Sequence, residues 1–155
     1  MLKYYNYDIV FQEIPDEVTL AINITNCPNH CPECHSKFLW DDVGEMLNED
    51  SMEEIISKYR DAITCFCFMG GDREPQEVNR LAACVKEKHA PIKVGWYSGK
   101  QEISKDIELC HFDFIKVGPY IDNKGSLKQR TTNQHLYKIL TNQELEDITH
   151  RFWKK

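Results

Sequence analysis

Long apolar runs are missing from this chain: no stretch approaches the roughly 20 consecutive apolar residues that a membrane-spanning helix needs. The N-terminus, Met1 to Tyr7, is aromatic and polar, which is unlike a secretory signal peptide. Basic residues are also few, since 19 Lys and Arg stand against 25 Asp and Glu, and none cluster into a basic stripe. We therefore expect a cytoplasmic protein with no membrane or nucleic-acid partner.

The seven cysteines are an odd number and do not read as a disulfide framework. They concentrate in one loop and in one strand-like run that holds Cys65 and Cys67. This usage fits reduced thiols in a reducing compartment. We expect Cys65 and Cys67 to pack in the core, because buried free cysteine behaves as a small hydrophobic residue.

Hydrophobic periodicity predicts strands that alternate with helices in a single domain, residues 1–155, without repeats or linkers. The predicted strands span 2–13, 18–25, 64–69, 92–97 and 112–117. The predicted helices lie around 51–59, 78–85, 103–110 and 141–153. Capping-box patterns, Ser51/Glu54 and Thr141/Glu144, open the first and the last of these helices. The region 122–155 is predicted as a polar loop followed by the C-terminal helix.

Strands that alternate with helices favour a parallel sheet. About four or five strand-helix units fit this length, whereas a closed eight-fold barrel typically takes about 250 residues. We therefore predict an α/β fold, a partial (open) β/α barrel with a mostly parallel sheet.

Three cysteines in the segment 26–35, Cys27, Cys31 and Cys34, follow the strand at 18–25 with the spacing C-x3-C-x2-C. Three thiolates hold three irons of a four-iron cube, whereas electron-transfer clusters normally take four cysteines. The spacing thus predicts an iron-sulfur cluster with one iron that has no protein ligand. An open metal position is typical of chemistry rather than of a structural role.

The alternative for this loop is a structural zinc site completed by His30 or His35. Structural zinc sites usually pair ligands from two knuckles, and no second C-x2-C or H-x3-H pattern is present, so the cluster is favoured. The four remaining histidines show no ligand-like spacing and are interpreted as surface or locally bonded residues: His89, His111, His135 and His150.

Two further motifs follow predicted strands. Gly70-Gly71-Asp72 comes after the strand at 64–69, and Ser98-Gly99 comes after the strand at 92–97. Because functional sites of parallel sheets lie at the carboxyl ends of the strands, both motifs should meet the cysteine loop at one edge. The glycines let a ligand approach the backbone, while the carboxylate and the hydroxyl suit a ligand with ammonium and ribose groups.

The cysteine loop and the Gly-Gly-acidic motif resemble those of the radical S-adenosylmethionine superfamily, glycyl-radical-activating branch. Within it, the chain is similar to the activating proteins of anaerobic ribonucleoside-triphosphate reductases, whose acidic motif can be Gly-Gly-Asp. The segment Gln129-Arg130-Thr131-Thr132-Asn133-Gln134 also resembles theirs. The likeness covers roughly Tyr5 to Tyr137.

The resemblance implies that Cys27, Cys31 and Cys34 bind a [4Fe-4S] cluster whose fourth iron is chelated by S-adenosyl-L-methionine. Reductive cleavage of this cofactor would produce methionine and a 5′-deoxyadenosyl radical, which takes hydrogen from a glycine of the partner. The implied partners are a large glycyl-radical ribonucleotide reductase and a flavodoxin- or ferredoxin-type electron donor.

By the same resemblance, several residues would contact the cofactor. Asp72 would accept hydrogen bonds from the methionyl ammonium, beside Gly70 and Gly71, and Ser98 would reach the ribose. Residues at and around the third cysteine would also contact it through their backbone groups: Glu33, Cys34 and His35. Glu33 stands where many members of the superfamily have an aromatic residue, so the adenine contact is left unassigned.

Two other functions remain open: a radical S-adenosylmethionine enzyme that modifies a small metabolite, and a non-catalytic zinc-binding interaction module. A short open barrel offers little chain for a closed pocket, whereas a loop of a large partner could fill the open side. The small size therefore favours a macromolecular substrate.

Overall fold

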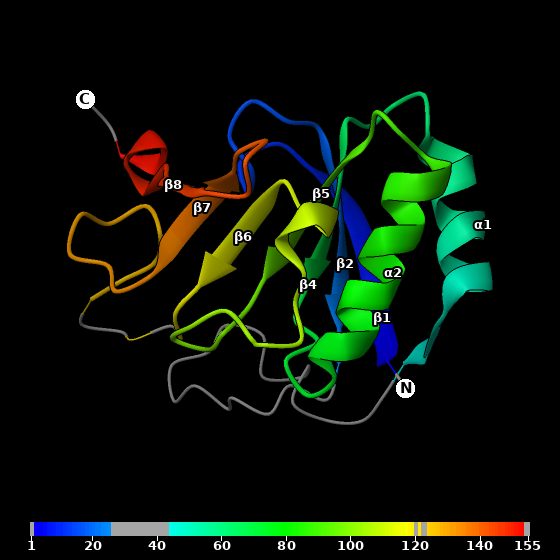
Figure 1. The fold of residues 1–155 in the computed structure, drawn as a ribbon, viewed down its shortest axis with the longest axis horizontal. Coiled ribbons are helices and arrows are strands. Elements are labelled where there is room, and N and C mark those ends of the chain that lie inside the picture. The colour runs from blue at the N-terminus through cyan, green and yellow to red at the C-terminus, as the bar shows by residue number, and fades with distance from the viewer. Residues whose placement is uncertain (1, 26–43, 120, 122–123, 154–155) are drawn as a thin grey trace.

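The computed structural model describes residues 2–25, 44–119, 121 and 124–153. Its strands are β1 (Leu2–Val10), β2 (Thr19–Ile24), β3 (Glu45–Leu47), β4 (Cys65–Met69), β5 (Lys93–Tyr97), β6 (Phe114–Val117), β7 (His135–Ile139) and β8 (Leu145–Asp147). Its helices are α1 (Glu49–Tyr59), α2 (Pro75–Lys88) and the short 3-10 helices η2 (Leu109–His111) and η3 (Thr149–Phe152). In the described part of the chain, the strands form one open sheet in the order β3-β1-β2-β4-β5-β6-β7-β8 (Figure 1).

The centre of the sheet is parallel and its flanks are antiparallel. Strands β2, β4, β5 and β6 run in one direction, and their arrowheads point to the same edge (Figure 1). Strands β1 and β3 add antiparallel pairs on one side, and β7 and β8 add them on the other. The fold is therefore mixed α/β, and the prediction of a mostly parallel sheet is wrong for the flanks. That the sheet curves into a partial barrel stays a prediction.

The predicted C-terminal helix is wrong, because residues 141–144 turn the chain between β7 and β8. Gln143 has a φ of 65°, and the amide of Glu144 donates to the Asn142 side chain at 3.1 Å. A left-handed residue and a side chain that bonds its own backbone are turn chemistry, and they override the Thr141/Glu144 pattern. The remainder of the segment forms β8 and η3.

Helix α1 is confirmed, but its N-terminal cap differs from the predicted one. Asn48, rather than Ser51, is the N-cap: its side chain accepts from the Ser51 amide at 2.9 Å. The Ser51 hydroxyl in turn accepts from the Asn48 amide at 3.0 Å. This reciprocal pair satisfies two backbone donors, so Ser51 acts as the third helical residue of a capping box that begins at Asn48.

The predicted helix at 103–110 is also wrong, because this segment forms irregular chain with a turn at 105–106 and then enters η2. Ile107 is buried, so the apolar residues of this segment pack in the core without forming a helix. The Ser104 hydroxyl accepts from the Asp106 amide at 3.2 Å, which gives the backbone an alternative to the helical ladder.

Each face of the sheet carries its own apolar cluster. Helices α1 and α2 cover one face, where Val78, Leu81 and Val85 of α2 pack with Phe66 and Phe68 of β4. The opposite face holds the second cluster, with Ile14, Phe114 and Leu136 among its members.

Cys65 and Cys67 belong to the cluster on the opposite face and are fully buried, as predicted. Burial raises the pKa of the Cys65 thiol to about 12 and that of Cys67 well above its usual value.

None of the helices in the described residues has the length and apolar character to cross a membrane.

Candidate site at the carboxyl edge of the parallel strands

The parallel strands end at one edge, where the motifs predicted from the sequence follow them. Gly70-Gly71-Asp72 follows β4, and Ser98-Gly99 follows β5, the neighbouring strand. The predicted cluster ligands Cys27, Cys31 and Cys34, together with Glu33 and His35, lie outside the described residues. Their segment follows β2, the neighbour of β4 on the other side.

The described residues on either side of the segment 26–43 are both held against β1. At its start, the amide of Thr25 donates to the Lys3 carbonyl at 2.9 Å, and the Thr25 hydroxyl donates to the same oxygen. At its end, Gly44 has a φ of +103°, and an added Cβ would lie 2.1 Å from the Tyr4 carbonyl oxygen. Thr25 and Gly44, the described residues on either side of this segment, therefore lie against adjacent residues of β1, and the close approach at Gly44 requires glycine.

The Gly70-Gly71 turn packs directly against the end of β2. Both glycines have positive φ, +115° and +93°. A Cβ on Gly70 would lie 3.2 Å from the Ile24 carbonyl oxygen, and one on Gly71 would lie 2.5 Å from a methyl group of Val78. The turn thus needs glycine for its backbone conformation and for the close approach of β2 and α2.

Trp96 holds the same turn from the neighbouring strand. Its indole Nε1 donates to the Gly70 carbonyl at 2.6 Å, and its ring is 1% exposed. The Gly70 amide donates to the Tyr97 carbonyl at 3.0 Å, so β5 fixes the turn through both polar groups of Gly70. Trp96 therefore both packs in the core and positions the Gly70-Gly71 turn.

Asp72 and Ser98 are brought together by the two strand ends. The Ser98 hydroxyl donates to Asp72 Oδ1 at 2.5 Å, and the Gly99 amide donates to Oδ2 at 2.8 Å. The Lys100 amide donates to the Ser98 hydroxyl oxygen at 3.1 Å, which fixes that hydroxyl as a donor to the carboxylate. These two donors account for two of the roughly four hydrogen bonds that an ionised carboxylate accepts.

Lys116 is a buried cation at the same edge that sequence reasoning missed. Register aligns Met69, Tyr97 and Lys116 on β4, β5 and β6, so their side chains share the face opposite the helices. Lys116 Nζ donates to the Gly118 carbonyl at 2.8 Å and to the Ser98 carbonyl at 3.2 Å, and it lies 5.7 Å from the Tyr97 ring centroid. The signal available in the sequence was a lysine inside the apolar strand Phe114–Val117, where charge is costly to bury.

Tyr97 lies between Met69 and Lys116 in this register and bonds the chain before β2. Its hydroxyl donates to the Glu13 carbonyl, which ties the chain between β1 and β2 to β5. Burial raises the pKa of the Tyr97 hydroxyl well above its usual value, with the Cys67 thiol and Glu13 adding to the shift. The phenol therefore stays neutral and acts as a hydrogen-bond donor rather than as an acid or base.

The residues at this edge fit a zwitterionic ligand. Asp72 supplies a carboxylate that suits an ammonium group, and Lys116 supplies an ammonium that suits a carboxylate. Ser98 contacts both residues: its hydroxyl donates to Asp72, and its carbonyl accepts from Lys116. The two glycines keep the backbone of the turn before Asp72 free of side chains.

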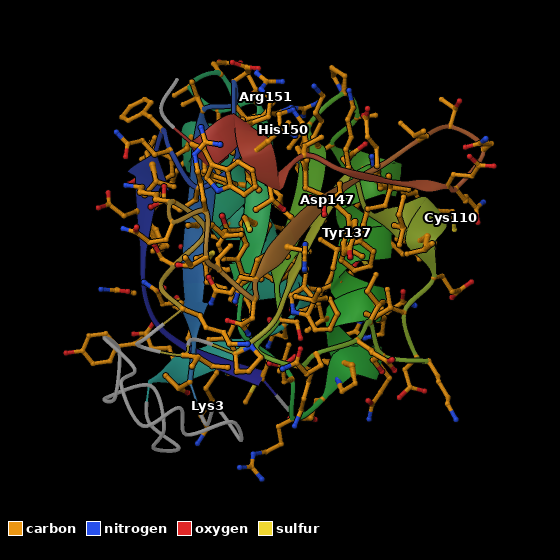
Figure 2. The ribbon with its side chains drawn as sticks, turned by 90° about the vertical axis from the view of Figure 1, so that its left-hand side faces the viewer. Lys3, Cys110, Tyr137, Asp147, His150 and Arg151 are labelled. Atoms are coloured by element: carbon orange, nitrogen blue, oxygen red, sulfur yellow. The ribbon has the colours of Figure 1, made fainter. Side chains whose placement is uncertain are left out.

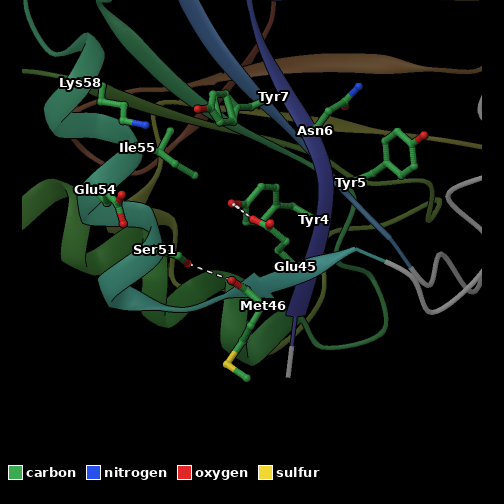
Figure 3. Close-up of a pocket in the computed structure, with 10 residues that line it drawn as sticks. All are labelled: Tyr4, Tyr5, Asn6, Tyr7, Glu45, Met46, Ser51, Glu54, Ile55 and Lys58. Atoms are coloured by element: carbon green, nitrogen blue, oxygen red, sulfur yellow. Dashed lines mark hydrogen bonds between the residues drawn. The ribbon is translucent and has the colours of Figure 1, made fainter.

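Two further hollows flank this edge. A cavity of about 580 Å³ lies between β1, β3 and α1, where the Tyr4 hydroxyl donates to Glu45 at 2.9 Å (Figure 3). Burial, followed by the bond and charge of Glu45, raises the pKa of Tyr4 to about 12. A smaller hollow, about 370 Å³, is lined by Arg130, Thr132 and Gln134 of the segment singled out in the sequence, with Asp147 and His150 opposite. Figure 2 shows these last two residues at the end of the chain that carries β8 and η3.

Residues 18–146 match the family described as a 4Fe-4S single cluster domain. The chain belongs to this family. The match spans the cysteine segment and all four parallel strands, so this single-cluster domain is a 4Fe-4S cluster-binding, iron-sulfur protein. Membership favours the cluster over the structural zinc site for the cysteine loop. Comparison with curated proteins and with solved structures gives no match.

Proposed function

We propose that this single-cluster domain is a radical S-adenosylmethionine activase that generates a glycyl radical on a partner anaerobic ribonucleoside-triphosphate reductase. The observation that carries the proposal is the Asp72 carboxylate, held by Ser98 and Gly99 at the end of β4, the strand that pairs with β2. The cysteine segment follows β2 in the sequence. An electron-transfer protein needs only the cluster, whereas an acidic turn held in one orientation suits a ligand with an ammonium group.

Cys27, Cys31 and Cys34 would hold the [4Fe-4S] cluster and leave one iron for the amine and carboxylate of S-adenosylmethionine. When bound and reduced, this pair supplies one-electron cleavage of the cofactor and hydrogen abstraction from the substrate.

The residues of the chain itself bind and orient the cofactor. Asp72 accepts hydrogen bonds from the methionyl ammonium, a charge-assisted contact whose geometry Ser98 and Gly99 set in advance. Gly70 and Gly71 permit close approach to their backbone. Lys116 would add a positive charge to the surroundings of the site, since its Nζ donates to the carbonyl of Ser98, the residue whose hydroxyl holds Asp72.

The size of the domain supports a macromolecular substrate. The described sheet is open, and only its parallel centre and one flank are covered by α1 and α2 on the helical face. A partial barrel built on such a sheet leaves a side through which a loop of a large reductase can reach the cluster, and it offers little chain to enclose a free metabolite.

The first test of this proposal is cofactor cleavage. The protein is loaded with cluster without oxygen, reduced, and given S-adenosylmethionine, and methionine and 5′-deoxyadenosine are quantified. We expect Asp72→Asn to weaken cofactor binding by about tenfold, because one charge-assisted hydrogen bond contributes about 1.5 kcal/mol.

Glu77→Gln is the matched control, since Glu77 lies on α2 and bonds Arg80 instead of the strand-end network. The proposal is wrong if the cluster-loaded protein binds no S-adenosylmethionine, or if Asp72→Asn and Glu77→Gln bind it as tightly as the wild type.

A further inference from the structure

A second group of metal-ligating side chains lies away from the strand-end site. Glu108, Cys110 and His111 each present one ligand atom, and these three atoms lie within 4.8 Å of one another. Figure 2 shows Cys110 at the margin of the molecule, well separated from Lys3, which anchors the cysteine segment. The group combines a thiol, an imidazole and a carboxylate, which are the three side-chain ligand types of zinc.

From this arrangement we propose that Glu108, Cys110 and His111 form a second metal site, which binds one Zn²⁺ or a similar borderline divalent transition-metal ion. The site has three protein ligands and an open fourth position for water or for a group of a bound partner. It is independent of the cluster and of the proposed radical chemistry.

The local backbone explains why these side chains converge. Glu108 caps η2 and His111 ends it, and the His111 amide donates to the Glu108 carbonyl at 3.1 Å. In a 3-10 turn, residues three apart lie one above the other, so Glu108 and His111 face the same direction. His111 Nε2 lies 3.7 Å from Glu108 Oε1, and Cys110 Sγ lies 3.9 Å from the same nitrogen.

These separations are close to those of a bound tetrahedral ion. With zinc bonds of about 2.0 to 2.3 Å, ligand atoms stand roughly 3.3 to 3.6 Å apart. The two separations from His111 Nε2 exceed this range by a few tenths of an ångström. Cys110 Sγ lies closer to the other ring nitrogen, Nδ1, at 3.7 Å, and all three ligand atoms lie within 4.8 Å of one another, so binding requires side-chain rotation. Cys110 and Glu108 are exposed, so an ion can enter from solvent and the ligands can rotate without disturbing the core.

A residue of α2 orients the carboxylate. Asn79 Nδ2 donates to Glu108 Oε1 at 3.1 Å, and the Glu108 amide donates to Asn79 Oδ1 at 2.8 Å. These two hydrogen bonds connect Glu108 to helix α2 and fix its position. Partners of this kind orient metal ligands, and their loss typically weakens metal binding by about 10 to 100-fold.

The test measures Zn²⁺ binding to the cluster-loaded protein without oxygen, so that the cluster cysteines are already occupied. Equilibrium dialysis against Zn²⁺ followed by elemental analysis should find one zinc per chain in the wild type and in Cys84→Ser. Cys84→Ser is the matched control because Cys84 is partly exposed on α2 and lies outside the group. We expect Cys110→Ser and His111→Ala to weaken this binding at least about tenfold, and Asn79→Ala to weaken it by about tenfold.

A second readout separates the site from weak surface binding. Titration with Cd²⁺ should produce a thiolate-to-metal charge-transfer band in the difference spectrum of the wild type and of Cys84→Ser but not of Cys110→Ser. Iron content, measured in the same samples, checks that each variant keeps its cluster. The inference is wrong if the wild type retains no zinc beyond the cluster-loaded baseline, or if Cys110→Ser and His111→Ala bind zinc and cadmium as the wild type does.

Discussion

Ser98 and Asp72 are joined by a 2.5 Å hydrogen bond although they stand 26 positions apart in the sequence. The bond links the ends of β4 and β5, and the Gly99 amide completes the hold on the carboxylate. Asp72 therefore has a fixed orientation before any ligand arrives. Binding then loses less side-chain freedom than it would with a mobile carboxylate.

Replacing Ser98 tests this preorganisation. Ser98→Ala removes one hydrogen bond to a charged group, so we expect the free energy of unfolding to fall by about 1.5 kcal/mol and S-adenosylmethionine binding to weaken severalfold. Urea denaturation and calorimetric titration measure the two effects. Ser104→Ala is the control, because its hydroxyl bonds only a local amide in an irregular segment. Equal cofactor affinity in Ser98→Ala and wild type would contradict a role for Ser98 in holding Asp72.

Gly71 should not tolerate a side chain. Gly71→Ala places a Cβ 2.5 Å from Val78 Cγ2 at a φ of +93°, so we expect a loss of about 1 to 3 kcal/mol from the backbone strain and more from the clash. In the double variant, Val78→Ala removes the methyl group that clashes with the new Cβ, so only the backbone strain at position 71 should remain. A double-mutant cycle measured by urea denaturation should therefore show coupling between the two sites, and strict additivity would contradict the contact.

Gly44 is the first described residue after the segment 26–43, and it lies against β1. Gly44→Ala brings a Cβ to 2.1 Å from the Tyr4 carbonyl oxygen, so the chain at this position must move away from β1. We expect lower iron and sulfide content after anaerobic cluster loading. Gly125→Ala is a matched control: its φ is also positive, at +81°, but the Cβ meets the flexible Gln129 side chain. If both variants load a full cluster, the anchor at Gly44 is not needed for cluster binding.

The buried thiols predict a loss of stability at alkaline pH. The folded-state pKa of Cys65 is about 12, above its usual value of 9.0. Its contribution is complete below pH 9 and is lost as the pH rises toward 12, because the unfolded thiol ionises first. Each such thiol lowers the free energy of unfolding by about 1.4 kcal/mol per pH unit in this range.

Urea denaturation of the reduced, cluster-free protein at several pH values above 9 measures this slope. Cys65→Ala should reduce the slope by one thiol's share. Cys67 and Cys84, whose pKa values are also raised by burial, should contribute to the remaining slope between pH 9 and pH 10, before the tyrosines ionise. An unchanged slope in Cys65→Ala would show that this thiol ionises equally in the folded and unfolded chains.

Local patterns in the sequence predicted the parallel centre of the fold well. The alternating run at 18–25 became β2, and the run before Gly70 became β4, because strands buried on both faces have strong apolar patterns. The flanks were harder. Strand β8 is fully exposed and carries no apolar alternation, so its pairing with β7 depends on the turn at Gln143 rather than on periodicity.

The candidate site was predictable where motifs follow strand ends, and less so where a contact depends on register. Placing Asp72 near Ser98 required only neighbouring parallel strands. The position of Lys116 beside them requires the pairing of Tyr97 with Lys116, which no sequence motif indicates. The hydrogen bond from Trp96 Nε1 to the Gly70 carbonyl likewise depends on the direction of the Trp96 side chain, which is set by packing in the folded chain.

The most direct test of the central claim is electron paramagnetic resonance of the partner reductase. The cluster-loaded protein is reduced and mixed with S-adenosylmethionine and a large anaerobic reductase that carries a C-terminal glycyl-radical segment. We predict a glycyl-radical signal that depends on the cofactor and is absent with Cys27→Ala, Cys31→Ala or Cys34→Ala, because two cysteines cannot hold the cube. Cofactor cleavage that proceeds with a small substrate, while the reductase never shows the radical, would contradict the claim.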